Sequence, residues 1–226
     1  MINTACPPPH TGVSLQFTSE AHILRNEWRW LATMPDGSSV LLAQLRPELS
    51  SEESLRRRYL YETKRLAGLT DLPVSKTIAL GPEPDNAAVG PWRLCEAPSG
   101  IRLDQWLNER APAPIDETIA LLINIASALQ RFHQTGFVLR DLEPRNISIG
   151  EDGTLRFADI GLARIDILSS LSASSLMLES SAYCAPEHLH ATLLDARADL
   201  YTLGAIAWQA FTGVLPHDGD SPFLRK

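Results

Sequence analysis

Four short segments in the second half of the chain carry acidic and amide side chains that could handle a phosphate group. In order they are Leu139–Asn146 (LRDLEPRN), Asp159–Gly161 (DIG), Ala185–Glu187 (APE) and Asp199–Gly204 (DLYTLG). Transfer of a phosphoryl group requires an aspartate near the acceptor hydroxyl and oxygen ligands for Mg²⁺. Each segment alone is better explained by solvated loop residues, so the prediction of this chemistry depends on their combination.

The order and spacing of the four segments resemble those of the eukaryotic-type Ser/Thr protein kinase family. They match its catalytic loop H-R-D-x-x-x-x-N, its D-F-G and A-P-E motifs, and the aspartate that begins the central helix of its C-lobe. The resemblance covers the chain from about Val13 to the C-terminus. It implies that Asp141 is the catalytic base and that Asn146 and Asp159 are the metal ligands that hold Mg²⁺ and ATP.

The glycine-rich part of the family pattern is missing. The family covers the nucleotide phosphates with a G-x-G-x-x-G loop, whose glycines match His22, Leu24 and Glu27 in this chain. No glycine lies between Gly12 and Gly37. Backbone amides therefore cannot approach the phosphates in the usual way.

The lysine that pairs with the phosphates is also missing. The family's V-A-I-K strand matches Val40–Ala43, which places Ala43 at the lysine position. The resemblance makes Glu62 the partner of that lysine and a residue of the nucleotide site. An inward carboxylate normally requires a partner, so Glu62 is either a relic or paired to something else. Alternatively, it lies at the edge of an ordinary apolar stripe formed by Leu55, Tyr59, Leu66 and Leu69. The substitution Ala43→Lys separates these interpretations: if Glu62 points inward as in the family, an ammonium beside it is expected to raise the melting temperature or give detectable nucleotide binding.

Two further departures affect the nucleotide and the transferred group. The segment Glu96–Gly100 matches the family's linker, which implies nucleotide contacts at Glu96 and a backbone N–H to adenine from its third residue. That residue is Pro98, which has no N–H; a register shift of one residue would place the donor elsewhere. In the catalytic loop, Leu139 replaces the histidine, and Glu143 replaces the lysine that meets the transferring phosphate. An anion at this position would repel the negative charge that develops on the phosphate during transfer.

The sequence therefore predicts a protein-kinase-like protein with weak binding of Mg²⁺ and ATP. We expect a pseudokinase that acts in signalling by binding a protein partner. The alternative is an active, atypical Ser/Thr protein kinase that transfers the γ-phosphate of ATP to a protein hydroxyl, because Asp141, Asn146 and Asp159 are all retained. A third interpretation is a fragment with no function of its own.

The elements that must position these residues form an α+β fold of two lobes. We expect a flexible leader over 1–12, a β-rich N-lobe over 13–96, a hinge at 97–100 and a mostly helical, incomplete C-lobe over 101–226. The N-lobe strands are predicted at Val13–Phe17, Glu27–Thr33, Val40–Leu45, Val74–Leu80 and Trp92–Glu96. A capping box, with Ser50 as N-cap and Glu53 three positions later, predicts the start of a helix that reaches about Leu69. The C-lobe is predicted to contain helices at Leu103–Arg110, Ile115–Thr135 and Ala196–Thr212, and a hairpin of Ile147–Ile149 with Leu155–Ala158.

Composition limits the class of protein and its compartment. The chain has 226 residues, of which 44% are hydrophobic, and a formal net charge of −7, so wholesale disorder and a nucleic-acid-coating function are both disfavoured. Cys6, Cys95 and Cys184 lie far apart, which argues against a disulfide framework and a zinc site and favours a reducing compartment. The sequence offers neither a signal peptide nor a stretch able to span a bilayer. We therefore expect a cytoplasmic protein.

The C-terminal part carries two further expectations. The chain ends at Lys226, where the family continues with more C-lobe helices. Without them, one flank of the last helix would be partly bare and would favour a homo-oligomer or a docked partner; its apolar residues are Ala205, Ile206, Trp208 and Phe211. The serine-rich stretch 169–181 is either an unmodified connector or a phosphorylation target with Arg140 as its pairing cation.

Overall fold

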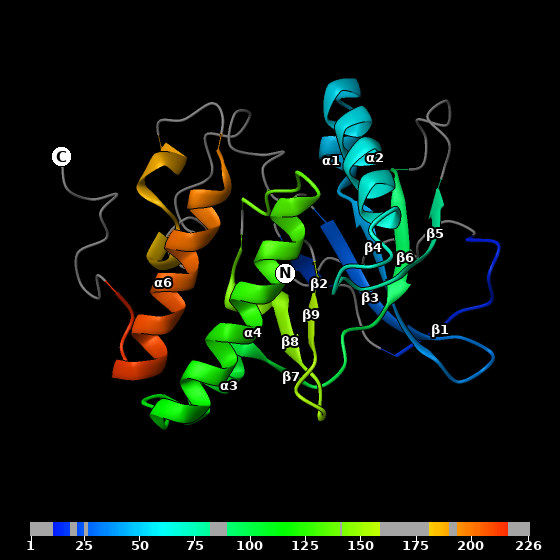
Figure 1. The fold of residues 1–226 in the computed structure, drawn as a ribbon. Helices are drawn as coiled ribbons and strands as arrows, with labels where there is room; N and C mark the ends of the chain where they lie inside the picture. Colours follow the sequence, from blue (N-terminus) through cyan, green and yellow to red (C-terminus); the bar gives the residue numbers. More distant parts are fainter. Residues whose placement is uncertain are drawn as a thin grey trace, which may run out of the picture. The chain divides into compact units, whose positions relative to one another are not determined.

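The computed structural model describes residues 11–18, 22–24, 27–81, 90–140, 142–158, 181–189 and 194–216. The chain divides into two compact units, Met1–Pro98 and Ser99–Lys226. In the described residues, the first unit holds an antiparallel sheet with a long helix, and the second holds three long helices and a small sheet (Figure 1). The predicted α+β class, with strands first and helices afterwards, is confirmed. The predicted domain limits stay a prediction.

The sheet of the first unit has the strand order β1-β3-β4-β6-β5, and β2 also pairs with β3. The strands are β1 (Gln16–Phe17), β2 (His22–Leu24), β3 (Glu27–Thr33), β4 (Ser39–Leu45), β5 (Thr77–Gly81) and β6 (Trp92–Glu96). Side chains alternate between the two faces of each strand. One face carries a buried cluster that includes Trp30, Leu42, Trp92 and Leu94. The opposite face therefore presents Glu27 and its neighbours at every second position.

The helix of the first unit begins later than the capping box predicts. A short helix α1 (Pro47–Ser50) comes first, with proline in its first turn, and α2 (Glu53–Ala67) follows with Glu52 as its N-cap. Ser50 is thus the last residue of α1 and is buried, and its hydroxyl has no hydrogen-bond partner among the described residues. The prediction of Ser50 as the N-cap is wrong, because Pro47 starts a helical turn of its own.

The small sheet of the second unit has the order β7-β8-β9, from β7 (Ile101–Arg102), β8 (Ile147–Ile149) and β9 (Leu155–Phe157). The hairpin of β8 and β9 is confirmed, whereas β7 was not predicted. Gly100 leads the chain into β7 with φ of +85°, and a Cβ there would lie 2.0 Å from the carbonyl oxygen of Ile149. Only glycine fits this close approach.

The second unit is built on three long helices, α3 (Leu103–Arg110), α4 (Ile115–Gln134) and α6 (Ala196–Thr212). Phe132 of α4 packs against Phe137 and Phe157, with ring centroids 6.1 and 5.4 Å apart, and so ties α4 to β9. On α6, Ala205 and Ile206 are buried. The expectation that they are bare is therefore wrong for these two residues.

Within the described ranges, no helix combines the length and the apolar character needed to cross a membrane.

Candidate functional site

The segment Leu139–Asn146, the LRDLEPRN loop, lies between α4 and β8 and is largely buried. Leu139, Leu142 and Asn146 are 0%, 3% and 7% exposed. Leu139, which stands at the family's histidine position, is thus a core residue that fixes the start of the loop. Asp141 and Asp159 lie outside the described residues, so their predicted roles stay predictions.

Asp199 of α6 holds the backbone of this loop. Its Oδ2 accepts hydrogen bonds from the N–H of Leu139 at 2.9 Å and lies 2.8 Å from Nε2 of His133, and its Oδ1 accepts from the N–H of Arg140 at 2.8 Å. Asp199 is 1% exposed, and Arg140 adopts φ of +67°, which is unfavourable for a residue with a Cβ. The two hydrogen bonds therefore hold the loop in a conformation that the chain alone would not favour.

Glu143 does not act as an isolated anion. Its Oε2 lies 2.6 Å from Nε of Arg145 in the same loop. The side chain of Glu143 is 5% exposed, whereas that of Arg145 is 32% exposed. A nearby guanidinium therefore balances the charge of Glu143, and the predicted repulsion between this residue and the transferring phosphate stays a prediction.

Asn146 connects the loop to the segment that precedes Asp159. It ends the 3₁₀ helix η1 (Pro144–Asn146), and its N–H donates to the carbonyl of Glu143 at 2.9 Å. Its own carbonyl accepts a hydrogen bond from Ala158 at 2.8 Å. The backbone thus ties the predicted ligand Asn146 to Ala158, the residue that precedes Asp159 in the sequence.

The segment before Glu187 is anchored on α6. It forms two 3₁₀ turns, η3 (Ser181–Tyr183) and η4 (Pro186–Leu189). Thr202 donates to the carbonyl of Tyr183 at 2.8 Å, and the Tyr183 hydroxyl bonds to Gln209. Burial and the charge of Asp104 raise the pKa of Tyr183 to about 12, so its hydroxyl keeps its proton and can donate this bond.

In the first unit, the position that the family's lysine would occupy is buried within the sheet. Ala43 on β4 is 0% exposed, and its Cα pairs with Arg29 on β3 and with Arg93 on β6. Glu62 of α2 is buried and lies 3.5 Å from Arg65, one turn further along its own helix. Of the alternatives for Glu62, pairing to another residue is the one that the structure supports.

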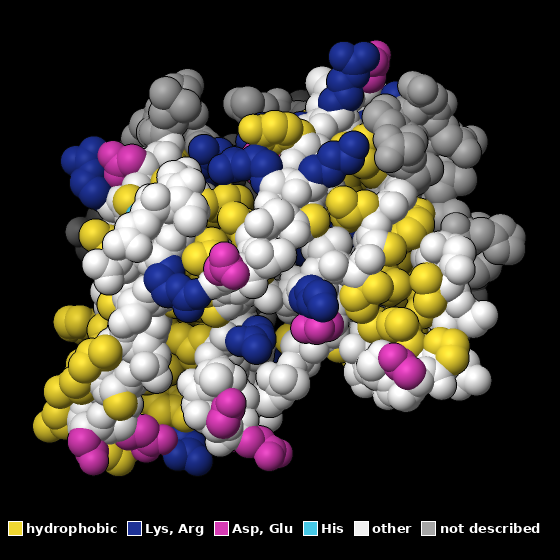
Figure 2. All heavy atoms as spheres, turned by 45° about the vertical axis from the view of Figure 1, so that its right-hand side comes forward, with side chains coloured by type: hydrophobic (Ala, Val, Ile, Leu, Met, Phe, Trp, Pro, Cys, Tyr) yellow, Lys and Arg dark blue, Asp and Glu magenta, His cyan; other side chains and the backbone are white. Residues whose placement is uncertain are grey.

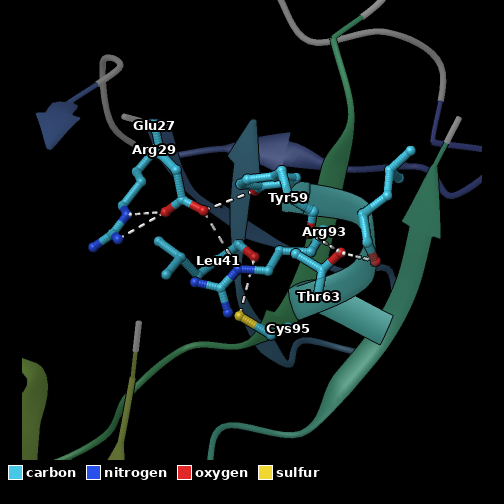
Figure 3. A network of polar contacts seen from close by, with 8 residues as sticks. Glu27, Arg29, Leu41, Tyr59, Thr63, Arg93 and Cys95 are labelled. Carbon is cyan, nitrogen blue, oxygen red and sulfur yellow. Dashed lines mark hydrogen bonds and ion pairs between the residues drawn. The ribbon is translucent and has the colours of Figure 1, made fainter. Parts of the chain in front are cut away.

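A buried polar cluster occupies the helix-covered face of this sheet, and its centre is Glu27 (Figure 3). Arg29 donates to Oε2 from Nε at 3.0 Å and Nη2 at 2.7 Å, and the Tyr59 hydroxyl donates to Oε1 at 2.7 Å. Nε of Arg93 lies 3.6 Å from Oε1. Burial raises the pKa of Glu27, but Arg29, Arg93 and the Tyr59 hydrogen bond outweigh it, so the net pKa is below the ordinary value. Glu27 is therefore an anion at neutral pH.

Two backbone donors at the start of the predicted linker, Glu96 and Ala97, are also engaged. The N–H of Glu96 donates to the carbonyl of Lys76 at 2.9 Å, and that of Ala97 donates to Ser39 at 3.0 Å. Pro98 has no N–H. If the family's donor position falls at Pro98 or one residue earlier, at Ala97, no free N–H is available there to donate to adenine.

The described residues of the first unit lack the contacts by which the family binds ATP. Ala43 offers no cation, and the guanidinium groups of Arg29 and Arg93 are directed to Glu27. The residues of this unit therefore do not fit the phosphate and adenine contacts that the resemblance implies. Sequence reasoning missed this cluster, although Arg93 within the apolar run Trp92–Cys95 could have indicated a buried cation.

Comparisons with known proteins agree with the motif order. A family model described as "Protein kinase domain" matches residues 86–223, more than half of the chain. A probable serine/threonine-protein kinase of Clostridium perfringens is 30% identical over 81% of this chain and 26% of its own length. A second, from Lactococcus lactis, is 34% identical over 57% of this chain and 20% of its own length. Serine/threonine-protein kinase PknL of Mycobacterium tuberculosis is 29% identical over 80% of this chain and 45% of its own length. The chain thus spans less than half the length of each of these bacterial relatives.

Proposed function

This chain belongs to the protein kinase domain family, and from that premise we propose that it is a pseudokinase that binds Mg²⁺ and ATP weakly and acts in signalling through a protein partner. The observation that carries the proposal is the buried Ala43, whose two neighbouring arginines are engaged by Glu27. A nucleotide would have to compete with a buried carboxylate for these cations. By analogy, removing one positioned hydrogen-bond donor from an oxyanion hole commonly costs catalysis roughly 3–4 kcal/mol.

A phosphotransfer assay tests this function. We expect the purified chain, incubated with radiolabelled ATP, Mg²⁺ and generic protein substrates, to incorporate no more label than the Asp141→Ala variant. Asp152→Ala is the matched control, because Asp152 is an exposed aspartate in the hairpin turn. Incorporation that Asp141→Ala abolishes and Asp152→Ala preserves would contradict the pseudokinase proposal.

One set of contacts favours the alternative of an active, atypical Ser/Thr protein kinase. Asp199 supports the backbone of the LRDLEPRN loop, and Arg145 balances Glu143. Both features support a loop that could still orient a hydroxyl group. In that case Asp141 is the base, Asn146 and Asp159 bind Mg²⁺, and the assay above gives label that depends on Asp141.

Self-association is the further expectation for the second unit. Trp208 and Phe211 on α6 are 53% and 40% exposed, and Figure 2 shows hydrophobic side chains reaching the surface between charged ones. Burying apolar surface yields about 25 cal/mol per Å². We therefore expect light scattering to show dimers or larger species at high concentration, and Trp208→Ser with Phe211→Ser to shift them to monomers.

The matched control is Tyr61→Ser, which removes an exposed aromatic side chain from the first unit. It should leave the distribution of species unchanged. A monodisperse monomer of the unaltered chain at high concentration would contradict self-association.

The described cysteines, Cys95 and Cys184, form no disulfide, which supports placing this protein's action in a reducing compartment such as the cytoplasm.

A further inference from the structure

The carboxylate of Glu27 joins three separate elements of the first unit. Glu27 and Arg29 lie on β3, Arg93 lies on β6, and Tyr59 lies on α2. Glu27, Tyr59 and Arg93 are 2%, 0% and 3% exposed. The contact of Tyr59 with Oε1 thus connects the helix to the sheet at a place from which water is excluded (Figure 3).

This connection lies in the row of the sheet where the resemblance places the missing lysine. Arg29, Ala43 and Arg93 are paired across β3, β4 and β6, so their side chains share one face. In the family, a lysine from the middle strand would reach the helix. Here the cations stand on the two flanking strands, and a carboxylate from β3 reaches Tyr59 instead.

Loss of one contact in this cluster would be strongly destabilising because its members are buried. Hydrogen bonds to an ionised acceptor are about twice as strong as neutral ones. Removing one partner of a buried ion pair leaves the other charge uncompensated and is strongly destabilising. Moving α2 away from the sheet would therefore cost free energy, because the buried carboxylate of Glu27 would lose the hydrogen bond from Tyr59 and could not replace it with one from water.

We propose that Glu27, Tyr59 and Arg93 form a clamp, the Glu27 clamp, that holds α2 against the sheet whether or not a nucleotide is present. The inference rests on the proposed function, because a pseudokinase must present fixed surfaces to its partner without help from ATP. Glu62 is not required for the clamp, since it pairs with Arg65 on its own helix. Tyr59 and Glu27 act in this proposal as positioning residues.

Amide hydrogen exchange over Glu53–Ala67 of the full chain tests the clamp. We expect Tyr59→Phe to speed exchange in α2 about tenfold or more, because a hydrogen bond to a charged acceptor is lost. Glu27→Gln should have a comparable or larger effect. The effects of the two changes should be less than additive, because Glu27→Gln removes the charge that strengthens the Tyr59 hydrogen bond and Tyr59→Phe removes that hydrogen bond itself. In the unaltered chain, adding millimolar Mg²⁺ and ATP should change the exchange rate of α2 by no more than about twofold relative to the ligand-free chain.

The control is Tyr61→Phe, which removes the hydroxyl of an exposed tyrosine on the same helix. It should leave exchange unchanged. The clamp is overturned if Tyr59→Phe behaves like Tyr61→Phe, if the two effects are additive, or if Mg²⁺ and ATP slow α2 exchange tenfold in the unaltered chain. Should Glu27→Gln fail to fold, the milder Tyr59→Phe still decides the question.

The test separates failure of the clamp from failure of the proposed function. If Mg²⁺ and ATP bind tightly and α2 exchange stays the same, the clamp stands and the pseudokinase proposal fails. If ATP does not bind and Tyr59→Phe has no effect, the clamp alone is wrong.

Discussion

The Asp199→Ala variant is expected to lose about 3–5 kcal/mol of unfolding free energy, because two N–H groups, one buried and one partly buried, lose their acceptor. These groups belong to Leu139 and Arg140. A buried N–H group left without an acceptor costs roughly 1–3 kcal/mol. Since domains are stable by only about 5–15 kcal/mol, the variant should unfold at a much lower urea concentration.

A second aspartate on the same helix provides the control. Asp195 is the N-cap of α6 and is exposed, and its side chain accepts a hydrogen bond from the N–H of Arg197. Asp195→Ala removes this cap and should cost only about 1 kcal/mol. Urea unfolding followed by circular dichroism measures both. Equal losses for the two variants would mean that Asp199 does not support the loop.

Ala43→Lys is expected to destabilise the protein by at least about 3 kcal/mol, the cost of an uncompensated buried charge. The new ammonium would start from the buried Ala43 position, between the buried Arg93 and the partly buried Arg29. Two like charges beside it would add repulsion. This expectation reverses the one drawn from the sequence, where the lysine was expected to pair with Glu62 and raise the melting temperature.

The size of the new side chain must be separated from its charge. Ala43→Met introduces a side chain of similar length without the ammonium, and overpacking alone typically costs about 1–3 kcal/mol. Thermal melting of both variants gives the comparison. If Ala43→Lys melts at or above the temperature of the unaltered chain, the arginine row and the Glu27 clamp are misassigned.

Elements with strong local signals could be predicted from the sequence. The bounds of β6 and α6 agree with the prediction, since an apolar strand before Pro98 and a helix ended by Gly213 are both marked by local residue types. The start of α2 could not be predicted, because Ser50 satisfies the capping-box pattern equally well. Pro47 begins the separate helix α1, and Ser50 is therefore the last residue of that helix and not the N-cap of α2.

The Glu27 cluster shows why much of the site could not be predicted. Its members come from β3, α2 and β6, so no local pattern joins Glu27 to Tyr59 or Arg93. The sequence does show that the family's lysine is missing, but not what occupies that row of the sheet. The pairing of Glu143 with Arg145 was within reach, since the two residues are separated by a single proline in the same loop.

Calorimetric titration of the full chain with ATP in the presence of Mg²⁺ tests the central claim most directly. The account predicts a dissociation constant no tighter than roughly millimolar, near −4 kcal/mol, because Ala43, the engaged hinge amides and Glu27 leave the nucleotide without its usual contacts. A low-micromolar dissociation constant would contradict it and would favour an active kinase with an atypical nucleotide site.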